Sequence, residues 1–359
     1  MSFPSARIDG DALRHNLAAV RRIAPDSRVV AVIKANAYGH GMIAVARALI
    51  AADAFGVARF DEAVALRAAG ISIPILLLEG VFTADELQVA GREQFQLVVH
   101  SFEQLTLLEQ SAATHRFAVW LKLNTGMNRL GFRPDEFETA LQRLKRCACV
   151  GTVKVMTHLA GAEEPGGETS RVQLDEFRAL TDTLGLEHSI ANSAGLIAWP
   201  EARTQWVRPG LMLYGISPIP GVDAAAIGLH PVMTLSTQLI ALREVPRGES
   251  VGYNGIWQAN RDSRIGIAAI GYGDGYPRHM RTGAPVLVNG SEASVVGRVS
   301  MDMMAVDVTD LPEARVGAAV VLWGEGLPAE RVAPYADTIP YELVCGVKQR
   351  VRMEWLGGD

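Results

Sequence analysis

What the 359-residue sequence lacks excludes several classes of protein. It has three cysteines, Cys147, Cys149 and Cys345, which cannot all pair, so we expect a reducing compartment and no disulfide scaffold. Lysine and arginine number 34 against 39 for aspartate and glutamate, whereas a nucleic-acid binder normally carries a basic face. No apolar run approaches the ~20 residues of a membrane helix, and the first residues show no signal segment. We therefore expect a cytoplasmic protein that binds neither nucleic acid nor membrane.

What is present fits a large globular protein. At ~150 residues per domain, the length corresponds to about two domains. Hydrophobic residues make up 49% and charged residues 20%, which is the ordinary globular balance. There is no internal repeat, and the hydrophobic pattern changes near residue 230. We therefore predict one domain over residues 1–228 and a second over 229–359.

The first predicted domain alternates short apolar runs with amphipathic segments. Most runs lack a two-residue alternation, as is typical of strands buried on both faces. Asp9 and Ser101 each precede a helical stripe and are predicted to cap it. Eight runs with intervening helices predict a (β/α)8 barrel of the TIM type, although an open doubly wound sheet has the same periodicity. The predicted strands cover 29–33, 54–57, 74–77, 96–99, 117–123, 150–157, 187–191 and 206–208, and the main helices 41–52, 60–69, 84–90, 102–112, 134–144 and 170–183.

The second predicted domain has a different pattern. After residue 231 the helical period largely vanishes, and glycine and proline punctuate short strand-like runs. This punctuation is typical of an antiparallel sheet or a small barrel. We therefore expect a mostly-β domain, with strands over 235–245, 263–276, 284–290, 293–299, 303–308 and 318–324.

Polar side chains follow five of the eight predicted barrel strands. The loops after barrel strands form one face, where active sites of this fold lie, so we expect these side chains to converge. Each alone has a duller explanation, such as a strand-end lysine, a hydrogen-bonded histidine or an ordinary turn. The hydroxyl of Ser193 and the unhindered amides of Gly195 and Gly210 fit an anion site. The converging residues are Lys34, Lys122, Arg129, His158, Asn192, Ser193, Arg208 and Gly210.

Nine motifs make the sequence similar to one enzyme family. They are AVIKANAYGHG (31–41), FGVAR (55–59), LLLEG (76–80), LKLNTGMNRLGF (121–132), WVRPGLMLYG (206–215), VGYNGIW (251–257), GYGDGYPR (271–278), GRVSMDM (297–303) and YELVC (341–345). Through them the chain resembles the alanine racemases, pyridoxal-phosphate enzymes with a barrel and a β domain (fold type III), along nearly its whole length. The resemblance implies interconversion of L- and D-alanine, to supply D-alanine for peptidoglycan or to degrade alanine.

The resemblance also implies two catalytic residues. Lys34 would form an imine with pyridoxal 5'-phosphate and then act as a base on one face of the substrate α-carbon. Tyr253 would act on the opposite face, supplied by the second subunit of a homodimer. Because tyrosine ordinarily titrates near 10, nearby cations must lower its pKa, and the candidates are Arg129, Arg208 and His158.

Further roles follow from the resemblance alone. Arg208 would face the ring nitrogen of the cofactor, and Arg129 its phenolic oxygen and the substrate carboxylate, helped by Met301. Lys122 would be carbamylated and hold Arg129, the alternative being a cation paired with a carboxylate. Asp302 would be a supporting residue, or else an exposed ion pair with Arg298. The remaining cofactor contacts would be Tyr38, His158, Asn192, Ser193, Gly210, Leu211 and Tyr341.

Two other functions stay open at this point. One is an amino acid decarboxylase of the same fold type, which the shorter chain and the intact motif around Tyr253 disfavour. The other is a protein that binds pyridoxal phosphate without catalysis. No metal is expected. Ser300, Leu159 and Asn254 depart from the residues usual in the family, so substrates other than alanine also stay open.

Overall fold

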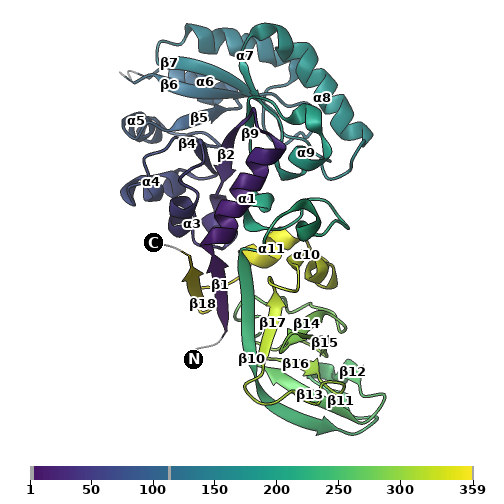
Figure 1. Cartoon of the computed structure of the whole chain (residues 1–359). Helices are drawn as coiled ribbons and strands as arrows, with labels where there is room; N and C mark the ends of the chain where they lie inside the picture. The colour runs from purple at the N-terminus through teal and green to yellow at the C-terminus, as the bar shows by residue number, and fades with distance from the viewer. Residues whose placement is uncertain (1–3, 112–114, 358–359) are drawn as a thin grey trace.

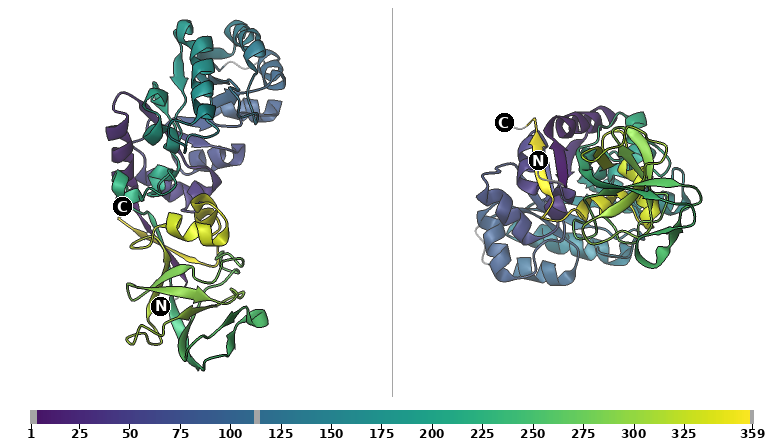
Figure 2. Two further views of the ribbon diagram at one scale, coloured as in Figure 1. Left: turned by 90° about the vertical axis from the view of Figure 1, so that its right-hand side faces the viewer. Right: turned by 90° about the horizontal axis from the view of Figure 1, so that it is seen from below.

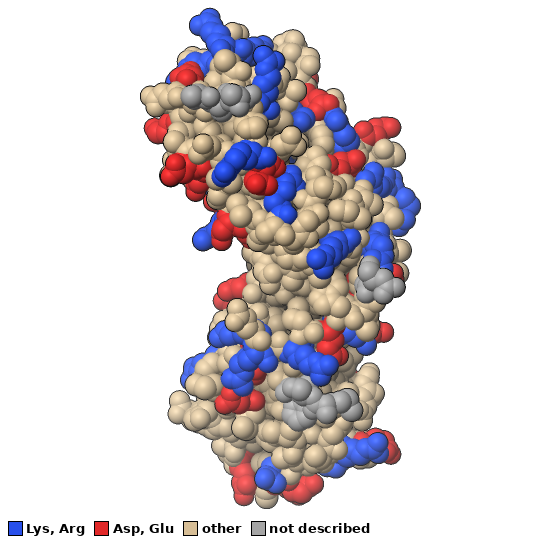
Figure 3. All heavy atoms as spheres, turned by 90° about the vertical axis from the view of Figure 1, so that its left-hand side faces the viewer, with Lys and Arg blue, Asp and Glu red and all other residues tan. Residues whose placement is uncertain are grey.

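The computed structural model describes residues 4–111 and 115–357, which form a barrel at one end of an elongated molecule and a β-rich part at the other (Figures 1 and 2). Within these residues, no helix is long and apolar enough to span a membrane. On the face drawn in Figure 3, basic and acidic side chains are interspersed, and neither sign forms a continuous stripe.

The predicted eight-stranded barrel is confirmed, and the open-sheet alternative is wrong. Parallel strands pair in chain order and close through β2 and β9. The strands bury side chains on both faces. One set, which includes Val30, Trp120 and Trp206, fills the barrel interior, and the residues that alternate with it along the strands pack on the helices. Burial on both faces is why the strands show little alternation. The strands are β2 (Arg28–Val32), β3 (Ala54–Val57), β4 (Ile75–Leu77), β5 (Gln96–Val99), β6 (Phe117–Lys122), β7 (Val150–Met156), β8 (Glu187–Ser189) and β9 (Trp206–Val207).

Helices follow the strands, and both predicted caps are confirmed. Asp9 Oδ1 accepts a hydrogen bond from Ala12 N at 2.9 Å, and Ser101 Oγ accepts one from Gln104 N at 3.4 Å. The predicted helix over 102–112 ends earlier, at Glu109, and residue 112 lies outside the described residues. The longer helices are α1 (Gly10–Ile23), α3 (Met42–Ala48), α4 (Phe60–Ala68), α5 (Ala84–Arg92), α6 (Phe102–Glu109), α7 (Pro134–Arg146), α8 (Glu168–Thr181) and the short α9 (Ser193–Ala198).

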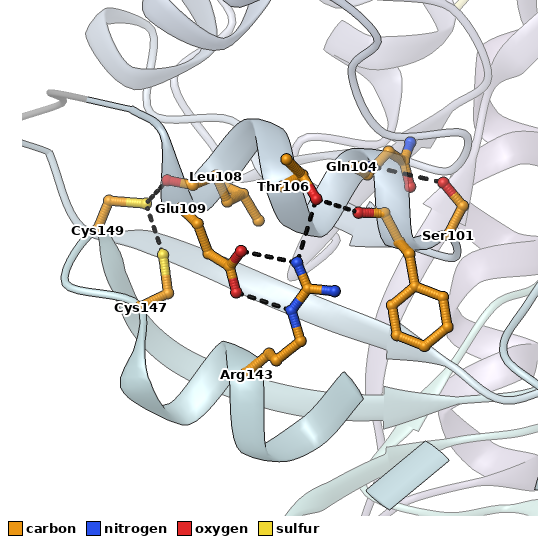
Figure 4. Close-up of polar contacts among 9 residues, drawn as sticks. Ser101, Gln104, Thr106, Leu108, Glu109, Arg143, Cys147 and Cys149 are labelled. Atoms are coloured by element: carbon orange, nitrogen blue, oxygen red, sulfur yellow. Dashed lines mark hydrogen bonds and ion pairs between the residues drawn. The ribbon is translucent and has the colours of Figure 1, made fainter. Parts of the chain in front are cut away.

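Helices α6 and α7 are joined by a polar cluster (Figure 4). Arg143 donates from Nε and Nη2 to the two carboxylate oxygens of Glu109 at 2.8 and 2.7 Å, and from Nη2 to Thr106 Oγ1 at 3.1 Å. The sulfur atoms of Cys147 and Cys149 lie 3.4 Å apart just beyond α7. All three cysteines are free thiols.

The β-rich part is built on one eight-stranded sheet, ordered β13-β16-β15-β14-β17-β10-β1-β18, with a further β13–β10 pairing. The predicted strand over 263–276 is too long, because β13 ends at Ala268 and a glycine-containing turn follows, with Gly275 at φ +105°. The strands are β1 (Ser5–Asp9), β10 (Met233–Val245), β13 (Ser263–Ala268), β14 (Pro285–Val288), β15 (Ser291–Val296), β16 (Met304–Asp307), β17 (Ala319–Trp323) and β18 (Arg352–Leu356), beside the hairpin β11 (Ser250–Val251) and β12 (Trp257–Gln258).

The two ends of the chain meet in this sheet. The first strand, β1, pairs antiparallel with β10 and parallel with β18, so it lies outside the barrel that it precedes. Two short helices, α10 (Ala329–Val332) and α11 (Pro340–Cys345), lie between the sheet and the barrel (Figure 1). Through α11, the C-terminal segment reaches the barrel loops. The boundary at residue 228 stays a prediction.

Candidate active site at the open end of the barrel

A cavity of about 490 Å³ lies at the C-terminal ends of the barrel strands. We call it the barrel cavity. It brings together ten residues that the sequence analysis named, which come from β6, the loops after several barrel strands, and α11. These are Lys34, Tyr38, Lys122, Arg129, His158, Asn192, Ser193, Arg208, Gly210 and Tyr341. Glu79 and Cys345 also line it. Sequence reasoning missed both, although they lie in the LLLEG segment and the YELVC motif.

Lys34 begins an unusual turn, α2 (Lys34–Tyr38). The four residues that follow it, 35–38, all have φ of 52–53°, although none is glycine. The left-handed conformation costs roughly 1–2 kcal/mol per residue, so surrounding contacts must hold it. Glu62 Oε1 accepts from Ala35 N at 2.7 Å, and Asn36 Oδ1 accepts from Met42 N at 2.9 Å. Nothing in the sequence pattern predicted this turn.

Four cationic side chains surround the barrel cavity. Burial, and next the charge of Arg129, lowers the pKa of Lys34. Burial, and next the charge of Arg208, lowers the pKa of Lys122 to about 8. Among the described residues, no carboxylate forms an ion pair with Lys122. The cavity therefore favours an anionic ligand and makes neutral amine available on both lysines.

His158 does not add to this positive charge. Burial, followed by the charge of Arg208, holds its pKa well below the ordinary value. Its Nδ1 lies 3.5 Å from Nη2 of Arg208. The imidazole is neutral near pH 7, so the prediction that His158 is a cation able to lower the pKa of Tyr253 is wrong.

Arg208 is a fixed cation at the floor of the barrel cavity. It is 4% exposed and donates to Ser189 Oγ at 2.5 Å, Thr157 O at 2.6 Å and Ile190 O at 3.2 Å. No carboxylate in the described part of the chain pairs with it. Burial lowers its pKa to about 10, so the guanidinium stays charged at neutral pH. Held by neutral acceptors, it presents an uncompensated charge to a ligand.

One end of the barrel cavity is suited to an anion. Ser193 Oγ accepts from Gly210 N at 2.9 Å and from Met212 N at 3.3 Å, so hydroxyl and backbone amides are gathered there. Gly210 is required because a Cβ at this position would lie 2.4 Å from the Tyr38 hydroxyl. Leu211 is buried next to Gly210 and does not line the cavity. Asn192 caps α9, accepting from Gly195 N at 2.8 Å.

The C-terminal segment completes the wall of the barrel cavity. The ring of Tyr341 from α11 lies 5.6 Å from that of Tyr38, which stacks at 4.8 Å on Tyr214. Burial raises the pKa of Tyr341 to about 12 and also raises that of Cys345. Both groups are therefore neutral near pH 7. Their distance along the sequence from Tyr38 hides this contact from any local pattern.

Besides Leu211, three predicted site residues lie outside the barrel cavity. Tyr253 stands on the turn between β11 and β12 and is 63% exposed, and Met301 is 53% exposed. Asp302 accepts from Arg350 Nη2 at 2.8 Å, so the predicted pairing with Arg298 is wrong. Within one chain, the barrel cavity holds Lys34 without Tyr253.

Comparisons with known proteins agree along the whole chain. The family model for the alanine racemase N-terminal domain matches residues 8–218, and that for the C-terminal domain matches residues 232–355. An Aeromonas hydrophila protein named alanine racemase is 51% identical, covering 99% of this chain and 100% of its own. An Escherichia coli protein named biosynthetic alanine racemase is 48% identical over the same shares. The crystal structure of biosynthetic alanine racemase from Pseudomonas aeruginosa superposes with a TM-score of 0.96 at 45% identity, covering 99% and 100% of the two chains.

Proposed function

The chain belongs to the alanine racemase family, and we propose that it carries out the family reaction with pyridoxal phosphate held in the barrel cavity. Its activity is the interconversion of L- and D-alanine. The observation that carries the cofactor proposal is the set of groups around this cavity. A lysine of lowered pKa faces it, together with a cluster of hydroxyls and amides and a buried arginine that no carboxylate of residues 4–111 and 115–357 pairs with.

These groups fit the three recognition needs of pyridoxal phosphate. Its aldehyde needs an amine, which Lys34 supplies, and its phosphate needs donors, which Tyr38 and Ser193 supply beside Gly210. Its ring nitrogen needs a partner, and we assign this role to Arg208. When bound, the cofactor withdraws electrons from the substrate α-carbon and so makes its proton acidic. We assign the remaining contacts to Arg129, His158, Asn192, Leu211 and Tyr341, with Met301 assisting at the substrate carboxylate.

Two proton-transfer groups are needed, because one group alone tends to return the proton to the face from which it came. We assign one face of the α-carbon to Lys34, whose lowered pKa favours a neutral amine that can accept a proton. We assign the other face to Tyr253. Because Tyr253 is exposed and outside the barrel cavity of its own chain, it is available to a second copy. A head-to-tail homodimer with two composite sites follows.

The test of the function is direct. Purified protein is incubated with L-alanine and pyridoxal phosphate, and D-alanine is measured by chiral chromatography, with α-carbon deuterium uptake followed in the same sample. We expect D-alanine to rise to an equal mixture of the two enantiomers. Release of carbon dioxide from a basic amino acid would instead indicate a decarboxylase. Visible absorbance of bound cofactor without turnover would indicate a binding protein.

The dimer proposal has its own experiment. Lys34→Ala and Tyr253→Ala proteins, each inactive alone, are mixed under conditions that exchange subunits. With random pairing, half of the dimers are mixed and each has one intact site, so roughly a quarter of the wild-type rate should return. If exchange is demonstrated and no activity returns, each site must lie within one chain.

The physiological side of the proposal is a cytoplasmic enzyme that supplies D-alanine for peptidoglycan. The support is that two similar proteins are named biosynthetic. Expression of the chain should let a bacterium that lacks its own racemase grow without added D-alanine. The Lys34→Ala variant should fail to do so, and growth with that variant would contradict the proposal.

A further inference from the structure

His40 is a fully buried histidine that touches the strained turn from behind. Its Nδ1 lies 2.8 Å from the carbonyl oxygen of Tyr38 and 3.1 Å from that of Ala37. Carbonyl oxygens only accept hydrogen bonds, so Nδ1 must carry the hydrogen. Ala37 and Tyr38 both have left-handed φ angles. The imidazole therefore donates to the part of the backbone that most needs support.

The ring itself is held in place. It packs against Tyr214, with ring centroids 4.6 Å apart, and Tyr214 in turn stacks on Tyr38. The Tyr214 hydroxyl donates to Val32 O at 3.0 Å, at the end of the strand that precedes Lys34. His40 and Tyr214 thus connect the strand before the turn with the last residue of the turn.

The environment of Nε2, the other ring nitrogen of His40, indicates that the ring is there for its Nδ1–H. Nε2 of His40 is buried and has no hydrogen-bond partner among the described residues. Leaving an acceptor buried and unpaired is unfavourable, so a ring present only to fill space would be better replaced by an apolar one. Burial lowers the pKa of His40 to about 4, which keeps the ring neutral with a single hydrogen.

We propose that His40 is a positioning residue, whose Nδ1–H holds the left-handed turn so that Lys34 and Tyr38 both face the barrel cavity. The expected effect of His40 on cofactor binding rests on the proposed function. Its expected effect on the left-handed turn is independent of that function. His40 touches neither substrate nor cofactor in this arrangement, because Tyr38 and Tyr214 lie between it and the barrel cavity.

Two substitutions separate positioning from packing. His40→Asn keeps an amide donor close to the place of Nδ1 and loses the ring, whereas His40→Phe keeps a ring and loses the donor. The readouts are the dissociation constant of pyridoxal phosphate for the apoprotein, followed by absorbance, and kcat and KM for alanine. His188→Phe, which removes another buried imidazole that does not line the barrel cavity, is the matched control.

Under the proposal, His40→Phe raises the cofactor dissociation constant about tenfold and lowers kcat, as loss of one buried hydrogen bond implies. The KM of His40→Phe for alanine should stay within about threefold of wild type. For His40→Asn and for the control, the cofactor dissociation constant, kcat and KM should all stay within the same range. Wild-type behaviour of His40→Phe, together with a defect in His40→Asn, would overturn the proposal.

Two measurements keep the test independent of the proposed function. Nitrogen NMR of the wild-type apoprotein should show His40 as the Nδ1–H tautomer at pH 7, and the Nε2–H tautomer would refute the inference even if neither variant folds. The melting temperature of the apoprotein should be lower for His40→Phe than for His40→Asn. If no protein binds pyridoxal phosphate, the cofactor proposal fails, while these two results still decide the role of His40.

Discussion

Lys34 in the barrel cavity and Tyr253 on its turn lie in opposite environments. Lys34 is half-buried among other cations and has a lowered pKa. Tyr253 is 63% exposed, and its turn lies on the small β11–β12 hairpin away from that cavity. Under the proposed function, one proton-transfer group thus lies inside the cavity of its own chain, and the other lies on a surface that a second copy would have to cover. Under that proposal, neither region is a complete site alone.

The largest effect should come from removing Lys34, the proposed proton-transfer group inside the barrel cavity. Lys34→Ala should reduce D-alanine formation by about 10⁴-fold or more, because both covalent attachment and proton transfer are lost. The visible absorbance of bound cofactor should change with it. Lys145→Ala, an exposed lysine on α7, is the control. Retention of a tenth of the activity by Lys34→Ala would break the assignment.

A smaller effect should follow from crowding the anion end of the barrel cavity. In Gly210→Ala the new methyl group would meet the Tyr38 hydroxyl at 2.4 Å. Overpacking of this kind costs about 2 kcal/mol, which is about thirtyfold in the cofactor dissociation constant. Gly161→Ala, where the nearest atom would be 3.9 Å away, should bind normally. Equal affinities of the two variants would remove Gly210 from the phosphate site.

Arg208 should control what becomes of the substrate. Under the proposed function, a guanidinium that stays protonated would not readily leave a proton on the ring nitrogen of bound cofactor, which would keep the ring less electron-poor and suppress side reactions. Arg208→Glu should raise the pyruvate formed per D-alanine by about tenfold. The ratio is measured within one sample, so a smaller folded fraction does not affect it. An unchanged ratio would contradict this role.

Lys122 gives a pH-dependent prediction. With a pKa of about 8, its neutral form rises from about a tenth at pH 7 to about nine-tenths at pH 9. Only the neutral amine reacts with carbon dioxide, so at a fixed carbon dioxide concentration the initial rate of carbamate formation should rise with that fraction. Carbon NMR with labelled bicarbonate should show the carbamate signal in wild-type protein and not in Lys122→Ala. A bare amine at both pH values would contradict carbamylation of Lys122.

The smallest effect belongs to a contact remote from both regions. Arg143→Ala removes the bidentate pair with Glu109 between α6 and α7 (Figure 4). Both side chains are about one-third exposed, so the loss should be about 1 kcal/mol in the free energy of unfolding, seen by denaturant titration. The rate of racemisation should not change. A loss of activity in this variant would mean that the barrel cavity is coupled to this cluster.

Much of the fold could be predicted from the sequence. The barrel strands are short runs of two to seven residues, most of them apolar, whose burial leaves a local signature, and the caps at Asp9 and Ser101 are fixed within three residues of chain. The strand β1 could not be found, because five residues next to a helix start carry little periodicity. Its partners β10 and β18 lie far along the chain.

The composition of the barrel cavity was also largely predictable, since strand ends of a barrel must share one face. Its protonation states were not. His158 loses its charge because it is buried near Arg208, and Asp302 pairs with Arg350, 48 residues away. Charge depends on burial and on neighbours in space, and neither can be read from residue type.

The sequence by itself determined the barrel, the β domain and the residue types that bind and move protons, because each leaves a periodicity or a motif along the chain. Only the tertiary structure decided three things: the left-handed turn after Lys34, the lowered pKa of His158 beside Arg208, and the pairing of Asp302 with Arg350. Each of these depends on contacts between segments distant in the sequence, where packing and hydrogen bonds outweigh local preference.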